Sequence, residues 1–419
     1  MYRPPVVGRR LTALEAATRL GVKRETLYAY VSRGLLTRER AADGRSSTFS
    51  AEEIEALAAR TRQGGRAGGL ELIVASGLTL IEDDRLFYRG VDVADIVPAM
   101  PFESVAEWLW TSAPMSTGNP PPWPVTQITC PDIPGGRAID RLRVLVALAG
   151  AADDLRYDVE PSGVVAAARR ILSAMVDGLP AFGLPDRSPQ GRADRPAGSF
   201  PLAARLLPRL GPPSLANRMA ESELVEVVNA VLVLLADHEL AASTLAARVA
   251  ASVHADPYSV VSTGLGVIAG ALHGAASQPV VHLLDEIGSA DRVARVVGER
   301  LGRRERIPGL GHKVYRHTDP RAEILFDLLR RLPEPGPRWP VVEKLVALVR
   351  DRLRLVVNVD FALGAFVWAW ELDVAAAESL FAIARTAGWL AHAIEEYGET
   401  PVRFRPRAAY TGPRPADLR

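Results

Sequence analysis

Long segments with helical periodicity dominate this chain of 419 residues and limit what it can fold into. Within them, apolar Ala, Leu and Val residues recur at intervals of three and four, which places them on one face of an α-helix. Six such segments occur, at 138–152, 163–178, 221–236, 290–303, 342–356 and 374–397. Proline-rich passages predict loops between helices, at 113–136 and 185–199. The sequence therefore predicts a mostly α-helical protein.

The first 66 residues form a basic segment ahead of these helices. They contain 13 Lys and Arg residues against 7 Asp and Glu residues, whereas the whole chain has a net charge of only +1. Two short helices are predicted around Gly21, as in a helix-turn-helix. Their apolar faces are expected to consist of Leu14, Ala17, Leu20, Leu27, Tyr28 and Val31. The glycine-rich residues 63–69 predict a linker, so residues 1–62 are expected to be a separate module.

This module resembles the MerR/excisionase-like winged helix-turn-helix family in the passages ALEAATRLGVKRETLYAYVSRGLL and FSAEEIEAL, which an arginine-rich wing joins. The resemblance implies DNA binding, with a recognition helix in the major groove and basic side chains on phosphates. The candidate DNA-binding residues are Lys23, Arg24, Thr26, Tyr28, Arg33, Arg38 and Arg45. A helical module that only packs or mediates assembly is the alternative.

Composition excludes several classes of protein. Cys130 is the only cysteine, so an internal disulfide framework and a cysteine-built zinc site are excluded. Residues 1–10 carry no apolar run of signal-peptide length, which predicts a cytoplasmic protein. Residues 257–284 carry no Asp, Glu, Lys or Arg and are long enough to span a membrane, but polar residues, glycines and prolines interrupt them. We therefore expect a buried helix followed by a polar turn, and no membrane association.

Four histidines and one aspartate stand in unusual surroundings, among them His317 in the passage Lys-Val-Tyr-Arg-His-Thr-Asp-Pro-Arg. His238 lies in an Asp-His-Glu sequence at the end of an apolar helix, and His273 closes the helix expected within the uncharged segment. His312 ends the glycine-rich turn Ile-Pro-Gly-Leu-Gly-His, and Asp360 stands among apolar residues in Val-Asn-Val-Asp-Phe. Each alone has a structural explanation, as a buried histidine with one backbone partner or as a capping aspartate. Their joint presence points to a site.

Several common catalytic motifs are missing from the sequence. The sequence has no HExxH or HxH spacing that would predict a metal site. It also lacks the G-x-S-x-G motif of serine hydrolases, the P-loop of NTPases and the strand-linked G-x-G-x-x-G of Rossmann dehydrogenases. The remaining residue types suit proton abstraction beside a carbonyl group. A carboxylate in an apolar site is a stronger base because burial raises its pKa. Imidazole N–H groups stabilise an enolate oxygen, and arginines hold carboxylates.

From about residue 70 to residue 414, the chain resembles the citrate synthase family in its bacterial and methylcitrate-synthase-like branch. The resembling passages follow the family's order: LTLIEDDRLFYRGVDVADI, ADHELAASTLAARVAAS, ALHGAASQPV, IPGLGHKVYRHTDPRAEIL, NVDFALGA, ARTAGWLAHAIEE and FRPRAAYTGP. The resemblance implies an enzyme that condenses acetyl-CoA with oxaloacetate and water, giving citrate and CoA. Formation of 2-methylcitrate from propionyl-CoA is the alternative, because one methylene changes discrimination by only ~1–3 kcal/mol.

The resemblance also implies roles for individual residues. Asp360 matches the base that takes a proton from the acyl-CoA, His273 the group that stabilises the enolate, and His312 the group that polarises the oxaloacetate carbonyl. The expected oxaloacetate-binding residues are His238, Arg321, Arg385, Phe381 and, from a partner subunit, Arg405. The expected CoA-binding residues are Leu310, Gly311, Arg316 and Asn358. Ser243 is expected to orient His273.

The architecture implied by the resemblance is a homodimer of two-domain helical subunits. Residues 70–274 and 371–419 are expected to form a large domain, and residues 275–370 a small domain. Closure of the small domain over oxaloacetate would exclude water from the enolate. No metal or organic prosthetic group is implied, and the acyl-CoA is a substrate.

Two positions depart from the family's pattern. Ala241 and Ser277 stand where the family commonly has asparagine. Loss of an amide leaves a polar partner unpaired, at a cost of about 1–3 kcal/mol. Such changes suit altered acyl-CoA preference, slower turnover, or a DNA-binding regulator that keeps the fold as a metabolite sensor. Because all three catalytic residue types are present, we expect an active enzyme.

Overall fold

The computed structural model describes residues 10–20, 22, 27, 30–31, 36–40, 47–51, 53–54, 73–113, 123–126, 128–182, 200–211, 221–270, 273–332 and 338–405. The chain divides into two compact units, Met1–Ala75 and Ser76–Arg419. The division of the second unit into a large and a small domain at residues 275 and 370 stays a prediction.

The described part of the first unit contains an antiparallel sheet and helix α1 (Ala13–Leu20). The strands are β1 (Arg10–Thr12), β2 (Arg38–Arg40) and β3 (Ser47–Ser50), and β3 lies between the other two. The buried face of α1 consists of Ala13, Ala16, Ala17 and Leu20. Leu14 is 65 % exposed, so its predicted place on the apolar face was wrong. One residue corresponds to a rotation of about 100° around a helix, which turns Leu14 away from that face.

The candidate DNA-binding residues fall mostly outside the described part of this unit. Arg38 lies in β2 with its side chain exposed. The others, Lys23, Arg24, Thr26, Tyr28, Arg33 and Arg45, lie outside the described residues. The recognition helix therefore stays a prediction.

The second unit begins with a small antiparallel sheet. Strands β4 (Thr79–Glu82), β5 (Arg85–Tyr88) and β6 (Val91–Asp92) pair in chain order. Asp92 caps helix α4 (Val93–Ile96), because its carboxylate accepts a hydrogen bond from the backbone N–H of Ala94.

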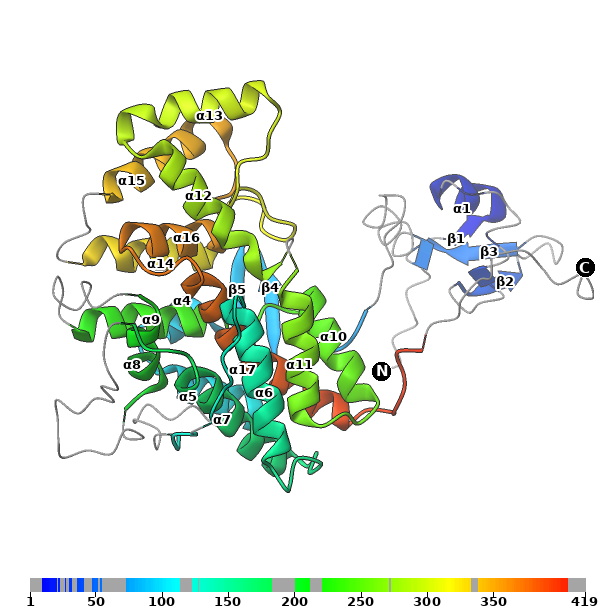
Figure 1. Ribbon diagram of the computed structural model, residues 1–419. Helices are drawn as coiled ribbons and strands as arrows, with labels where there is room; N and C mark the ends of the chain where they lie inside the picture. The colour runs from blue at the N-terminus through cyan, green and yellow to red at the C-terminus, as the bar shows by residue number, and fades with distance from the viewer. Residues whose placement is uncertain are drawn as a thin grey trace, which may run out of the picture. The chain divides into compact units, whose positions relative to one another are not determined.

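The remaining described elements of the second unit are helical. They are α5 (Phe102–Thr111), α6 (Ala138–Ala151), α7 (Pro161–Asp177), α8 (Leu202–Leu206), η2 (Leu207–Arg209), α9 (Glu221–Leu235), α10 (Ala242–Ser252), α11 (Pro257–Ile268), η3 (Gly274–Ser277), α12 (Gln278–Ile287), η4 (Ala290–Arg292), α13 (Val293–Gly302), α14 (Pro320–Arg331), α15 (Trp339–Leu348), η5 (Val349–Leu353), α16 (Val359–Ala369) and α17 (Ala376–Tyr397). The prediction of a mostly α-helical protein is confirmed. Figure 1 shows α12, α13 and α15 together at one end of this unit, with α14 and α16 between them and the other helices.

The uncharged segment forms the predicted buried helix and polar turn. Helix α11 begins after Asp256, whose carboxylate accepts hydrogen bonds from the backbone N–H groups of Tyr258 and Ser259. The helix ends at Ile268, so His273 lies in the turn that follows and not in the helix itself. Among the described residues, no helix combines the length and the apolar character that a membrane span requires.

Helix α17 lies at the centre of the second unit, where it contacts α5, α6, α7, α9, α10 and α11. Nearly all of its side chains are buried, including the charged Arg385. Gly388 allows the close approach of α17 to α9, because a Cβ at this position would lie 2.4 Å from the carbonyl oxygen of Ala236. A charged side chain in such a place needs a partner or a ligand.

Candidate active site

The sequence-predicted catalytic and oxaloacetate-binding residues come from elements that contact one another. Helix α14 contacts α9 and α16, and both α16 and α17 contact η3. Arg321 lies in α14, Asp360 in α16, and Phe381 and Arg385 in α17, while His273 directly precedes η3. His238 lies in the loop after α9, and His312 lies in the loop before α14. Among the described residues, no group of three or more His, Cys, Asp and Glu side chains is arranged to hold a metal ion.

Two histidines and one tyrosine form a cluster of rings. The ring centroids of His238 and His312 are 5.4 Å apart, and the ring of Tyr315 lies 4.6 Å from His312. The hydroxyl of Tyr315 lies 3.1 Å from Nε2 of His238. Burial, together with the charges of Arg321 and Arg385, lowers the pKa of His238 well below its ordinary value of 6.5. His238 is therefore a neutral imidazole at neutral pH.

The backbone fixes the tautomer of His312. Its Nδ1 lies 3.1 and 3.2 Å from the backbone nitrogens of Val314 and Tyr315, which donate to it. Burial and then Arg321 lower the pKa of His312 to about 4, so the neutral ring carries its proton on Nε2. That nitrogen lies 3.4 Å from Nη2 of Arg321, which is also a donor. Two neighbouring donors suit a carbonyl or carboxylate oxygen that accepts from both.

Asp319 holds Arg321 in place. The carboxylate accepts from Nε of Arg321 at 3.0 Å and from Nη2 at 2.8 Å. It also caps α14 through the backbone N–H of Arg321 and binds the backbone N–H of Val359 at the start of α16. Asp319 is fully buried and Arg321 is 3 % exposed. Burial lowers the pKa of Arg321, but Asp319 outweighs it, so the arginine stays charged.

Asp360, in the first turn of α16, has the raised pKa that the sequence predicted. Burial raises the pKa of its carboxyl group from 3.8 to about 6, against the opposing effects of Arg321 and Ser277. The hydroxyl of Ser277 donates to its Oδ1 at 3.1 Å. Ser277, at the end of η3, therefore contacts the predicted base directly.

His273 lies between Phe381 of α17 and Ser243 of α10 and contacts both. Nε2 of His273 is 2.8 Å from Oγ of Ser243 in α10, as predicted for an orienting contact. The rings of His273 and Phe381 pack edge to face, with centroids 6.0 Å apart. Burial, with a contribution from Arg385, lowers the pKa of His273 to about 4. His273 is therefore also neutral at neutral pH.

Arg385 is a buried cation with an unused donor. Its Nε donates to the carbonyl oxygen of Leu235, the last residue of α9, at 2.9 Å. The C-terminal end of a helix is a favourable place for a cation because its free carbonyl groups carry partial negative charge. Its guanidinium carbon lies 5.0 Å from the ring centroid of Phe381. Nη2 is buried and has no hydrogen-bond partner among the described residues. Because an unpaired buried donor is costly, this nitrogen suits a bound carboxylate.

The predicted CoA-binding residues fall into two groups. Leu310 pairs with Val357 in a short β-bridge, and the side-chain amide of Asn358 donates to the carbonyl oxygen of Gly311 at 2.9 Å. This turn requires glycine at position 309, where φ is +75° and a Cβ would lie 2.5 Å from Cβ of Phe361. Arg316 lies apart from this turn, with an exposed side chain and its backbone N–H bound to Asp84.

Arg405 is the one predicted oxaloacetate-binding residue that the structure leaves exposed. Within the described part of the chain, it makes no contact with the other predicted oxaloacetate-binding residues.

Two contributing residues were missed from the sequence, Tyr315 and Asp319. Both lie in the passage GHKVYRHTDPR, and the Asp-Pro pair at 319–320 is a typical helix start. That signal identifies Asp319 as a cap but not as the partner of Arg321.

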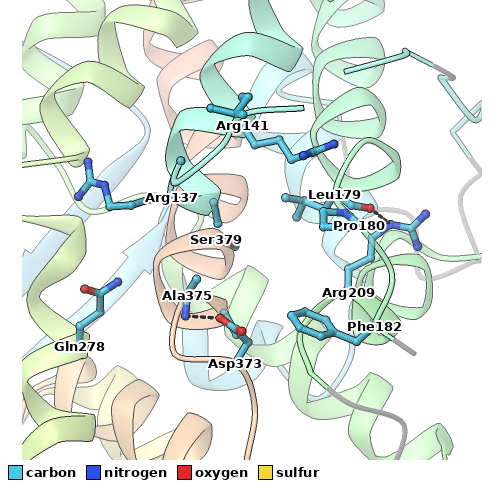
Figure 2. A pocket seen from close by; sticks show the side chains of 14 residues that line it. Arg137, Arg141, Leu179, Pro180, Phe182, Arg209, Gln278, Asp373, Ala375 and Ser379 are labelled. Carbon is cyan, nitrogen blue, oxygen red and sulfur yellow. Dashed lines mark hydrogen bonds between the residues drawn. The ribbon is translucent and has the colours of Figure 1, made fainter. Parts of the chain in front are cut away.

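A separate cavity of about 310 Å³ lies beside α17 and α6. Figure 2 shows Arg137, Arg141 and Arg209 around it, with Asp373 and Ser379 on one wall. Arg141 and Arg209 donate to the carbonyl oxygens of Gly178 and Leu179. The cavity's lining includes none of the predicted catalytic or substrate-binding residues.

The sequence of this mostly helical unit, which carries the histidines, the arginines and the half-buried Asp360, matches a known family. Residues 69–407 fit the family model "Citrate synthase, C-terminal domain", and the chain belongs to the citrate synthase family. "Citrate synthase 2" of Bacillus subtilis is 31 % identical over 364 residues, which cover 82 % of this chain and 95 % of that protein. The citrate synthase of Haloferax volcanii is 31 % identical over 386 residues, covering 84 % and 97 %.

Solved structures show the same fold. The citrate synthase of Thermotoga maritima matches with a TM-score of 0.58 and 26 % identity, over 82 % of this chain and 94 % of that one. A citrate synthase of Thermoplasma acidophilum, solved as a ternary complex with carboxymethyl coenzyme A and oxaloacetate, matches with a TM-score of 0.63 and 24 % identity, over 85 % of this chain and 99 % of that one. The second unit therefore has the mostly helical citrate synthase fold.

Proposed function

We propose that this chain condenses acetyl-CoA with oxaloacetate and water to give citrate and CoA. The observation that carries the proposal is the set of shifted pKa values at Asp360, His273 and His312. Asp360 has a pKa of about 6, His273 and His312 have pKa values of about 4, and both histidines lie near buried arginines. A carboxylate base beside neutral imidazole donors is the arrangement that enolate formation requires.

Enolisation is the first proposed step. Asp360 takes a proton from the carbon next to the thioester, and the electron pair of the C–H bond moves onto the thioester oxygen. His273 donates a hydrogen bond to that oxygen. Oγ of Ser243 lies 2.8 Å from Nε2 of His273. We assign the hydroxyl as the donor in this contact, so that the neutral ring carries its proton on Nδ1, where it can face the thioester.

Carbon–carbon bond formation follows. The enolate carbon attacks the ketone carbon of oxaloacetate, and the ketone oxygen takes a proton or hydrogen bond from Nε2 of His312. Arg321, Arg385 and His238 bind the substrate's carboxylates, and Phe381 packs beside Arg385. Water then hydrolyses the thioester and releases CoA. The proposed reaction uses no metal and no prosthetic group.

The remaining predicted site residues are assigned to CoA and to the partner subunit. Leu310, Gly311 and Asn358 line the acyl-CoA side, and Arg316 binds a CoA phosphate. Arg405 reaches the oxaloacetate of a second copy in a homodimer. The exposure of Arg316 and Arg405 supports this assignment, because neither guanidinium is committed to a partner among the described residues.

The test is release of free thiol from acetyl-CoA in the presence of oxaloacetate. Wild-type protein should release CoA, and Asp360→Asn should abolish release while oxaloacetate binding stays close to normal. Asp327→Asn, an exposed position on α14, is the matched control and should keep activity. Folded wild-type protein that binds oxaloacetate but releases no CoA from either acyl-CoA would contradict the proposal.

Propionyl-CoA is the alternative acyl substrate, with 2-methylcitrate as the product. A 2-methylcitrate synthase of Mycobacterium tuberculosis is 33 % identical over 199 residues, which cover 47 % of this chain and 50 % of that protein. The same thiol assay decides between the two substrates through the ratio of their kcat/KM values.

We also propose DNA binding by the first unit, which would make the protein a regulator or a bifunctional enzyme. Supporting this is the small sheet in which β2, with its exposed Arg38, pairs with β3. Binding to duplex DNA should weaken steeply with salt and disappear in the double variant Arg24→Ala/Arg38→Ala. Tight binding that is independent of both arginines would contradict this assignment.

A further inference from the structure

Ser277 is the only described side chain that donates a hydrogen bond to the carboxylate of Asp360. The hydroxyl lies 3.1 Å from Oδ1, and no described residue donates to Oδ2. Ser277 itself is 1 % exposed, so water does not compete freely for its hydroxyl. One carboxylate oxygen is therefore held and the other is left available.

The backbone around this contact is tightly packed on two sides. Gly364 lies one turn after Asp360 on α16, and a Cβ there would lie 2.9 Å from the carbonyl oxygen of Ser277 and 2.7 Å from Cβ of Val280. On another side, a Cβ at Gly309 would lie 2.5 Å from Cβ of Phe361. The two glycines let neighbouring segments approach α16 closely. This packing limits how far Ser277 and Asp360 can move apart.

We propose that Ser277 is a positioning residue for Asp360, holding Oδ1 so that Oδ2 faces the carbon from which the proton is taken. The inference rests on the proposed function. In the enolisation step the C–H bond breaks, its electron pair moves to the thioester oxygen, and the proton goes to Oδ2. A hydroxyl that donates to the ionised carboxylate also favours the form that acts as base.

Other charged groups act on the same carboxylate and must be separated from the effect of Ser277. They are Arg321 and Asp319 at the start of α14 and Arg385 on α17. Burial raises the pKa of Asp360, whereas Arg321, Ser277 and Arg385 lower it. A substitution at Ser277 alone keeps the charges of Arg321, Asp319 and Arg385. A shift of the pH profile is then due to the loss of the Ser277 hydroxyl.

The first experiment compares pH profiles of kcat/KM for CoA release. Ser277→Ala should move the acidic limb upward by about one pH unit, so that activity at pH 5 falls about tenfold. Ser277→Thr keeps a hydroxyl and should keep the wild-type limb. Ser173→Ala is the matched control, because it removes another buried serine hydroxyl, on α7, which has no partner among the described residues. A Ser277→Ala limb that coincides with the wild-type limb overturns the proposal.

A second experiment needs no catalysis. Urea unfolding at pH 8 of wild type, Ser277→Ala, Asp360→Ala and the double variant gives the coupling between the two side chains. Ser277→Ala should lower the unfolding midpoint in wild type and leave it nearly unchanged in the Asp360→Ala background. If Ser277 and Asp360 are coupled but wild-type protein releases no CoA, the hydrogen bond between them is supported and the proposed function is refuted. If wild-type protein releases CoA but the two side chains are not coupled, the positioning role of Ser277 is refuted.

Discussion

Replacing Asp319 with asparagine should be one of the most damaging single changes near the cluster. Four donors converge on its carboxylate: Nε, Nη2 and the backbone N–H of Arg321, and the backbone N–H of Val359. Asparagine has the same shape but offers one acceptor oxygen, and its NH2 group would face other donors. Arg321, only 3 % exposed, would lose the charge that balances it.

The expected cost follows from this geometry. Removal of one partner from a buried ion pair destabilises a protein by about 3–5 kcal/mol, because an uncompensated charge stays in the interior. The exposed pair of Arg330 with Asp327, on the same helix, is the control. Asp327 is 61 % exposed, so Asp327→Asn should cost less than about 1 kcal/mol.

Urea unfolding at pH 7.5, followed by tryptophan fluorescence, measures both changes. The comparison is informative because both variants replace one carboxylate of α14 with an amide and differ mainly in burial. If Asp319→Asn costs no more than Asp327→Asn, Asp319 does not hold Arg321 in the way described, and the support of α14 by α16 through Val359 must also be abandoned.

Two further changes test other parts of the site. The unfolding free energy of Asp360→Asn minus that of wild type should be constant below pH 4, rise between pH 4 and 6, and level off about 3 kcal/mol higher, because folding raises the pKa of Asp360 from 3.8 to about 6 and disfavours its ionised form. Urea unfolding across pH 3.5 to 8 measures this difference, and a difference that does not change with pH would contradict the raised pKa. Ala241→Asn should stabilise the protein by about 0.5–2 kcal/mol, because Ala241 is the N-cap of α10 and provides no side-chain acceptor. The control Ala242→Asn, one residue inside the helix, should give no such gain in the same unfolding experiment.

The helices could be predicted from the sequence because their signal is local. The periodic segment 163–178 became α7 at Pro161–Asp177, and the segment 374–397 became α17 at Ala376–Tyr397. The two-residue errors arise at the ends, where apolar spacing is weak. Pro161 occupies the first turn of α7, a favourable place for proline, but the periodicity does not include it.

The site could be predicted only in part, because its contacts join distant parts of the chain. Ser277 and Asp360 are 83 positions apart, and Arg385 reaches a carbonyl group 150 positions away. From the sequence, Ser277 was a position with a missing amide, and only the folded chain places its hydroxyl on Asp360. The contact of His238 with Tyr315 likewise joins two loops that are 77 positions apart.

Burial accounts mainly for the state of both the base and the donors, because it acts on both kinds of group toward the neutral form. Arg321 and Arg385 add to this by disfavouring protonated histidines, and they moderate it at Asp360 by favouring the ionised carboxylate. The ordinary order of pKa values is thereby inverted, with Asp360 at about 6 and His273 and His312 at about 4. As the pH rises, the histidines lose their protons before Asp360 does. Above pH 6 the cluster therefore holds an ionised base beside neutral N–H donors, and protonated imidazoles do not compete with Arg321 for the substrate's carboxylates.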